Sequence, residues 1–294
     1  MEKSESIVAS IRAAIAEGNL AHGDRQLRDY QDSNGITPEG LEALSWLARG
    51  CFAAQGFDQA ADYAQTAYRS AAKLLDTLDL DSEPSLASAL GASIEVIAQT
   101  KEREGRYQDA VRFLKQELAE YGLTSIGTRI RKNVNLLELE GQPAPELEIP
   151  EWLGPKPSSL AELHGRPVLL FFWAHYCEDS RDQTRVLARI VRKFEGDDLA
   201  LIGPTRRYGY LDEHRRKPAP PRQETSHIEM VLNGRYYSSL PGMPVPISER
   251  NFNVYGVSTT PTLVVIGSSG AVSLYHPGKM PFRELASQVQ RVLP

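Results

Sequence analysis

Hydrophobic residues recur at helical spacing throughout the first part of the chain, up to about position 140. Ile7, Ile11 and Ile15 form the first such stripe, which Glu17-Gly18 ends. Thr37-Pro38 opens a later stripe as an N-cap with proline at the first helical position. This part of the chain is therefore expected to be all α-helical. The expected helices cover residues 7–17, 24–31, 38–54, 57–77, 84–103, 107–121 and 124–139.

Two helix junctions in this region share a local pattern. In each, a glycine precedes an aromatic residue and an alanine follows three positions after it, as in 56–60 and 105–110. The pattern resembles the helical turn of tetratricopeptide repeats, in which small residues let antiparallel helices approach closely. Ala60 and Ala110 lie 50 residues apart, however, whereas the repeat usually spans about 34. The resemblance implies helical pairs that either offer a concave partner-binding surface or serve only as a scaffold.

The pattern changes after position 140. The segment Gly141-Gln142-Pro143-Ala144-Pro145 breaks helix propagation, and short apolar runs typical of buried strands follow. Strands are expected over 167–173, 199–203, 263–266 and 271–275, and helices over 179–194, 224–237, 251–255 and 281–293. The first two strands with the helix between them predict a βαβ unit, and the last two predict an antiparallel hairpin. The chain is thus expected to be an α+β protein with an all-α domain over 1–140 and an α/β domain over 141–294.

Composition and charge narrow the possible functions. The 294 residues suffice for two domains with separate cores. A formal charge of −5 gives no overall attraction to nucleic acid or anionic lipid. No apolar run approaches the roughly 20 residues of a transmembrane helix. The two cysteines are too few for a disulfide framework, and Cys51, among apolar neighbours, is interpreted as a small buried hydrophobe.

The candidate chemistry lies at residues 169–180. An apolar strand ends in Trp173-Ala174, an aromatic residue precedes Cys177, and an amphipathic helix follows directly. This order places the sulfur at a helix N-terminus, where unpaired N–H groups and the helix dipole stabilise a thiolate. The segment resembles the active site of the thioredoxin superfamily, and within it the ResA- and TlpA-like thiol–disulfide oxidoreductases. Those proteins usually read W-A-x-W-C-x-x-C here, whereas this chain has Ser180 at the last position.

Further motifs extend the resemblance over residues 141–294. They are the Gly-x-x-Ala-Pro opening at 141–145, the segment 158–165, and the run 257–262 around Thr260-Pro261. The resemblance implies a thioredoxin fold in which Thr260-Pro261 is a cis bond facing Cys177. Such a bond provides a platform for an extended, cysteine-bearing peptide. By the same resemblance, Trp173, His175 and Tyr176 are expected to form the rim of the site.

The Cys-x-x-Ser sequence limits the chemistry. Release of a substrate within one site requires a second thiol, which Ser180 cannot supply. The Ser180 hydroxyl is expected instead to donate a hydrogen bond to the Cys177 thiolate. A mixed disulfide on Cys177 would be resolved by glutathione, by another protein thiol or by the second cysteine of the substrate. That chemistry suits isomerisation, deglutathionylation or substrate capture better than dithiol reduction.

Several residues depart from the family pattern. Phe171 stands six residues before the cysteine, where thioredoxins carry a buried acid. Glu178 and Asp179 put negative charge beside the sulfur, which opposes the stabilisation of the thiolate by the helix dipole. His175 either favours the thiolate when it is protonated or is an exposed loop residue. A peroxidase is less well supported, because Ala174 occupies the place of the hydroxyl that peroxiredoxins need. No metal or cofactor is expected, since no cluster of His, Cys and Asp has ligand spacing.

A basic, aromatic stretch at 205–222 lies between two expected elements. It is either a lid or docking strip near the site, or a solvated insertion. Its basic and aromatic residues are Arg206, Arg207, Tyr208, Tyr210, Arg215, Arg216 and Lys217.

These observations predict thiol–disulfide exchange on protein thiols or disulfides through the single thiol of Cys177, with a protein partner on the helical domain. The alternative is a redox-inactive interaction scaffold in which both domains bind partners. The resemblance implies an extracytoplasmic, for example periplasmic, location. Residues 1–6 instead lead into an amphipathic pattern without a signal-peptide core, which taken literally indicates a cytoplasmic protein. Removal of an export signal would reconcile the two.

Overall fold

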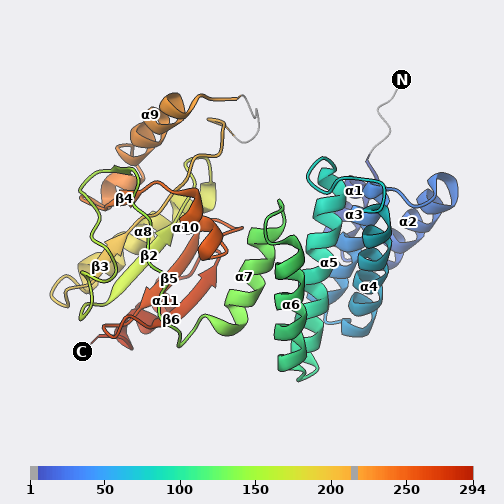
Figure 1. Cartoon of the computed structure of the whole chain (residues 1–294), viewed down its shortest axis with the longest axis horizontal. Helices are drawn as coiled ribbons and strands as arrows, with labels where there is room; N and C mark the ends of the chain where they lie inside the picture. The colour runs from blue at the N-terminus through green and yellow to red at the C-terminus, as the bar shows by residue number, and fades with distance from the viewer. Residues whose placement is uncertain (1–5, 213–217, 294) are drawn as a thin grey trace. The chain divides into compact units, whose positions relative to one another are not determined.

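The chain divides into two compact units, Met1–Val134 and Asn135–Pro294. The computed structural model describes residues 6–212 and 218–293, so Arg215, Arg216 and Lys217 of the basic stretch lie outside the described residues. The first unit is helical, and the second contains the β-sheets (Figure 1). The division falls inside helix α7 (Gly127–Glu138), so the expected domain boundary at 140/141 stays a prediction. No helix in the described ranges is both long and apolar enough to cross a membrane.

The helical part of the chain has the elements that the hydrophobic pattern predicted. Thr37 caps its helix as expected, because its hydroxyl oxygen accepts a hydrogen bond of 3.0 Å from the Gly40 N–H. The second helix is longer than predicted, since the Asn19 side chain accepts from the His22 N–H and starts the helix ahead of Asp24. The helices are α1 (Ile7–Ala16), α2 (Leu20–Asn34), α3 (Pro38–Ala53), α4 (Phe57–Leu74), α5 (Pro84–Arg103), α6 (Tyr107–Tyr121) and α7.

The two similar helix junctions place small residues inside the packing. Ala60 and Ala110 are both fully buried, as the pattern requires for close helix approach. The two glycines are not equivalent, however. The residue two positions before each aromatic adopts a left-handed conformation, and it is Gln55 (φ 64°) in the first junction and Gly105 (φ 77°) in the second. Cys51 is buried beside Ala60 in the core of α3, α4 and α5, as predicted.

The second unit is built on a four-stranded sheet with the order β3-β2-β5-β6. Strand β2 (Val168–Phe172) pairs in parallel with β3 (Ala200–Ile202) and antiparallel with β5 (Thr262–Ile266), which pairs antiparallel with β6 (Val272–Pro277). Helix α8 (Glu178–Lys193) connects β2 to β3, which confirms the predicted βαβ unit. The antiparallel pairing of β5 with β6 confirms the predicted hairpin. Two short strands, β1 (Trp152–Leu153) and β4 (Val245–Pro246), form a separate antiparallel pair.

Both faces of this sheet are covered. Alternate residues of β2 enter two different cores, because successive side chains of a strand point to opposite faces. Leu169 and Phe171 pack with residues of α8 and of α11 (Phe282–Gln290), whereas Leu170 and Phe172 pack with α10 (Glu249–Val254). This sheet order, with helices on both faces, is that of a thioredoxin-like fold, and it occupies about half of the chain (Figure 1).

One expected helix in this unit is wrong in its extent. Helix α9 covers Pro221–Leu232, and a separate 3-10 turn, η1, covers Tyr237–Ser239. Pro221 starts α9 earlier than predicted, and the Asn233-Gly234 pair ends it earlier. In α8, Leu187, Ile190 and Phe194 are buried, whereas Val191 is 38% exposed.

Candidate active site

Cys177 is the N-cap of α8. Its sulfur accepts a hydrogen bond of 3.4 Å from the Ser180 N–H, and its own N–H donates to the Ala174 carbonyl at 3.1 Å. The side chain is half-buried, so the sulfur can be reached from solvent. The predicted position of the sulfur at a helix N-terminus is therefore confirmed, and an N–H donor at that position favours the thiolate form.

The segment before β5 lies directly against this cysteine. The Thr260-Pro261 bond is cis, as the resemblance implied. The Cys177 thiol lies 3.2 Å from the Thr260 carbonyl oxygen, to which it donates a hydrogen bond. Pro261 is buried and Thr260 is half-buried. Two segments 83 residues apart in sequence thus meet at the sulfur atom.

Ser180 does not act as the sequence predicted. Its side chain is fully buried, and its hydroxyl makes no hydrogen bond to any described residue. The contact to the Cys177 sulfur comes from the backbone N–H of Ser180, which any residue other than proline would supply. The expectation that the hydroxyl donates to the sulfur is therefore wrong in this structure.

Trp173 is part of the core and does not form a rim. It is fully buried, its indole N–H donates to the Gly203 carbonyl at 3.0 Å, and its ring lies 4.4 Å from that of Tyr237. A Cβ at Gly203 would lie 2.6 Å from the end of the Met243 side chain and 3.3 Å from the indole nitrogen, so a larger residue there would displace Met243. The strand register directs Trp173 inward, and its role is to support the turn that carries Cys177.

His175 is also buried, which corrects the expectation of an exposed loop residue or a rim residue. Its Nε2–H donates to the Tyr210 carbonyl at 3.0 Å, because a carbonyl can only accept. The other nitrogen, Nδ1, then carries no proton and lies 4.0 Å from a carboxylate oxygen of Glu224. Burial lowers the pKa of His175 from 6.5 to about 4. The imidazole is therefore neutral near pH 7, and it cannot favour the Cys177 thiolate by its charge.

This lowered pKa predicts an acid-dependent loss of stability. The unfolded chain binds a proton at His175 below its ordinary pKa of 6.5, while the folded chain does not until about 4. Stability therefore falls as the pH drops through this window, by about 2 kcal/mol between about pH 7 and about pH 5. Urea unfolding of the wild type and of His175→Gln at both pH values checks this. Equal pH dependence of the two proteins would contradict the assignment.

Glu224 on α9 is a buried acid that the sequence analysis missed. Its side chain is 1% exposed, and its carboxylate accepts hydrogen bonds from the N–H groups of Tyr208 and Gly209, the latter at 2.9 Å. It thus ties the first half of the basic stretch to α9, beside His175. The one sequence sign was its spacing of four residues from the buried Ile228, which puts a carboxylate on an apolar helix face. Phe171, in place of the family's buried acid, lies in the core.

Aromatic side chains from the basic stretch surround the residues next to Cys177. The Tyr176 ring lies 4.9 Å from that of Tyr208 and 5.3 Å from that of Tyr210, and the His175 ring lies 5.8 Å from that of Tyr208. The guanidinium carbon of Arg206 lies 4.7 Å from the centre of the Tyr208 ring. Residues 205–210 therefore pack onto the active-site turn, and the alternative of a purely solvated insertion is wrong for this half of the stretch.

Replacing Glu224 by glutamine is expected to loosen this packing. The amide keeps one oxygen acceptor but presents an NH₂ group to the second backbone N–H, which is left without a partner. We expect a loss of about 2 kcal/mol in the free energy of unfolding and faster amide exchange at Tyr208 and Gly209. Glu229→Gln, at an exposed site on the same helix, is the matched control and is expected to change the free energy by less than about 0.5 kcal/mol. Equal effects of the two substitutions would refute this role for Glu224.

The acidic residues after Cys177 are partly neutralised. Asp179 pairs with Lys279 at 2.6 Å, and Lys279 also lies 3.3 Å from Asp182. On the other side of the turn, Arg181 donates to the His175 carbonyl at 3.1 Å. The negative charge beside the Cys177 sulfur is therefore partly offset by Lys279, and Arg181 adds a positive charge to the same turn.

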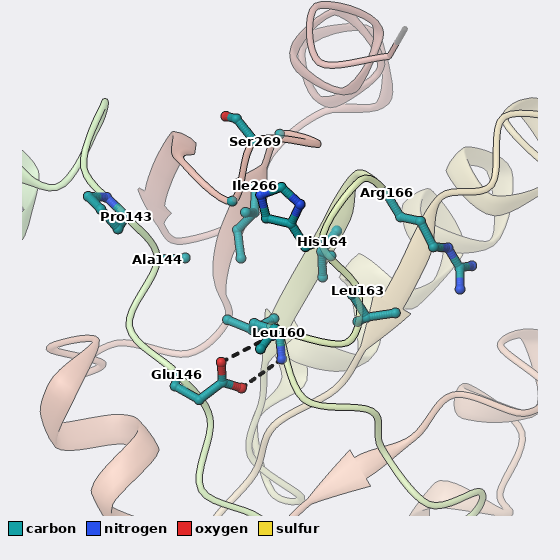
Figure 2. Close-up of a pocket in the computed structure, with 13 residues that line it drawn as sticks. Pro143, Ala144, Glu146, Leu160, Leu163, His164, Arg166, Ile266 and Ser269 are labelled. Carbon is teal, nitrogen blue, oxygen red and sulfur yellow. Dashed lines mark hydrogen bonds between the residues drawn. The ribbon is translucent and has the colours of Figure 1, made fainter.

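A separate pocket of about 220 Å³ lies at the other end of the sheet (Figure 2). Its lining includes Val168 at the start of β2 and Ile266 at the end of β5, whereas Cys177 follows the end of β2. Glu146 at its edge accepts hydrogen bonds from the Leu160 and Ala161 N–H groups, so its carboxylate stabilises a turn. Within residues 6–212 and 218–293, no cluster of His, Cys, Asp and Glu is arranged to hold a metal ion.

Comparisons with known proteins give matches over about half of the chain. No protein-family model matches. The thioredoxin-like protein YneN of Bacillus subtilis is 23% identical over 151 residues, which are 51% of this chain and 78% of that protein. A thiol:disulfide interchange protein of the thioredoxin family from Chlorobium tepidum is 16% identical with a TM-score of 0.40, covering 52% of this chain and 97% of that one. The exposed lipoprotein thioredoxin of Streptococcus pneumoniae is 20% identical with a TM-score of 0.39, covering 50% and 99%.

Proposed function

We propose that this protein exchanges thiols and disulfides on cysteine-containing proteins through the single thiol of Cys177. The observation that carries the proposal is the geometry at the sulfur. A half-exposed cysteine caps α8, with the Ser180 N–H at 3.4 Å and the carbonyl before a cis proline at 3.2 Å. Sequence similarity to a thioredoxin-like protein supports a redox role over the same share of the chain as the fold.

The proposed reaction has two steps. The Cys177 thiolate attacks one sulfur of a substrate disulfide, so that this S–S bond breaks and the departing thiolate takes up a proton. A second thiolate, from the substrate or from a small thiol compound, then attacks the substrate sulfur of the mixed disulfide, since Ser180 offers no sulfur. A new disulfide forms between these two sulfurs, and the Cys177 thiolate is released. The Thr260-Pro261 segment would align the substrate as an extended strand, with Tyr176 beside it. Ser180 and Trp173 shape the active-site turn without contacting the substrate. The buried His175 also positions this turn.

The proposal extends to the helical unit and to location. We propose that the first unit is a tetratricopeptide-like domain that binds a protein partner, which the buried alanines at its two helix junctions support. An extracytoplasmic location, where disulfides persist, belongs to the same proposal and rests on the family resemblance of the Cys177 motif. The redox-inactive scaffold is the competing function, and it differs in one measurable property, the reactivity of Cys177.

The test is the formation of a mixed disulfide. The reduced protein is incubated with a short disulfide-bonded peptide, quenched with acid and analysed by intact mass and peptide mapping. We expect one peptide adduct on Cys177 that a small thiol removes, and none on Cys51, which is buried. Absence of an adduct, while a free cysteine-containing reference peptide reacts, would support the scaffold function instead.

A further inference from the structure

A row of charged residues crosses the first unit on alternate helices. Helices α1 and α3 are in contact, as are α3 and α5, and Glu95 on α5 pairs with residues of α7. The charged residues are Arg12 on α1, Arg49 on α3, Glu95 on α5, and Arg129 and Lys132 on α7. We refer to these five as the cationic row. Four of the five are basic, although the rest of this unit has an excess of acidic residues.

The single carboxylate of the row is already engaged. Glu95 lies 2.7 Å from Arg129 and 2.8 Å from Lys132. Burial opposes its ionisation, but the attraction of both cations outweighs burial and lowers the pKa of Glu95 to about 2. Glu95 is therefore ionised at neutral pH and balances only one of its two neighbours.

Arg12 and Arg49, in contrast, form no ion pair with a described carboxylate. Their guanidinium carbons lie 4.8 Å and 4.1 Å from the centre of the Trp46 ring, which holds both groups in place. Both side chains are exposed, and in the described part of the chain no carboxylate lies within 4.0 Å of either. Burial of its inner part and the nearby charge of Arg129 lower the pKa of Arg49, and Arg12 acts in the same direction. Glu95 acts in the opposite direction on Arg49, but it forms its ion pairs with Arg129 and Lys132, so among the described residues Arg12 and Arg49 are held close together without an ion pair of their own.

We infer that the cationic row binds an acidic segment of a partner protein, with Arg12 and Arg49 as its anchoring residues. Guanidinium groups bind carboxylates through two parallel hydrogen bonds, and two of them fixed on one ring offer a preformed site for neighbouring acidic side chains. A phosphate-rich chain offers related chemistry to guanidinium groups, and the oligonucleotide comparison in the test below distinguishes it from an acidic peptide. This interaction goes beyond the proposed redox function and does not depend on it.

The test uses the full chain and two dye-labelled peptides of ten residues, one alternating Glu and Ala and the other alternating Gln and Ala. Fluorescence anisotropy at low and at physiological salt measures binding. We expect the Glu peptide to bind at least about tenfold more tightly than the Gln peptide, and the difference to shrink with salt. Arg49→Gln and Arg12→Gln are each expected to weaken binding about three- to fivefold.

Two controls make the outcome specific. Arg69→Gln removes an exposed cation from α4 in the same unit and is expected to leave binding unchanged. Cys177→Ala is likewise expected to bind the Glu peptide normally, which separates this inference from the redox proposal. Equal binding of the two peptides, equal effects of Arg69→Gln and Arg49→Gln, or tighter binding of a single-stranded oligonucleotide than of the Glu peptide would each overturn the inference.

Discussion

The Cys177→Ala variant is expected to lose all covalent capture of disulfide substrates. Only two cysteines exist in the chain, and Cys51 is 1% exposed in the core of the helical unit, where burial raises its pKa. Of the two thiols, only that of Cys177 is therefore accessible in the folded protein. Intact mass after incubation with a disulfide-bonded peptide measures the effect, and the adduct should fall below detection.

The matched control for this variant is Cys51→Ala. Because Cys51 fills core volume, this change is expected to lower the free energy of unfolding by about 1–2 kcal/mol while leaving the adduct yield unchanged. An adduct that persists in Cys177→Ala and disappears in Cys51→Ala would move the chemistry to the other unit and refute the assignment.

The Ser180→Cys variant is expected to gain the second thiol that the site lacks. Its backbone N–H already lies 3.4 Å from the Cys177 sulfur, and the two residues are separated by one helical turn at the start of α8. This spacing suits a disulfide, and the buried Ser180 side chain leaves the new thiol next to Cys177. The second step would become intramolecular, so the rate of insulin reduction with dithiothreitol as electron donor should rise by on the order of tenfold or more.

The control for this gain is Ser180→Ala. The hydroxyl has no hydrogen-bond partner among the described residues, so its removal is expected to leave the yield of the adduct unchanged. The free energy of unfolding is expected to change by no more than about 0.5 kcal/mol. A Ser180→Cys protein that retains three free thiols by mass after oxidation, instead of the single thiol of Cys51, would show that the Cys177 sulfur is not positioned for exchange at this helix terminus.

Much of the fold could be predicted from the chain because its signals are local. The stripe of Ile7, Ile11 and Ile15, the cap at Thr37 and the apolar run of β2 each determine an element through neighbouring residues alone. The errors occur where local signals compete. The Asn19 side chain extends α2 backward, and Pro221 starts α9 early.

The site was predicted less completely, because its second half depends on distant contacts. Cys177 and Thr260-Pro261 carry recognisable motifs, and they meet as expected. The burial of His175 could not be predicted, since it results from Tyr210 and Glu224 folding over the turn from far along the chain. Glu224 itself has no motif, and only its place on the apolar face of α9 distinguishes it from the other acids.

The most direct test of the central claim is the rate of Cys177 alkylation as a function of pH. Iodoacetamide labelling followed by peptide mapping separates Cys177 from Cys51. The account predicts fast labelling with an apparent pKa clearly below the free-cysteine value of about 8.5, because the Ser180 N–H and the start of α8 favour the thiolate. It also predicts no inflection near pH 6.5, because His175 stays neutral there. A pKa at or above the free-cysteine value, or slow labelling at every pH, would contradict a working single-thiol site and leave the protein as a binding scaffold.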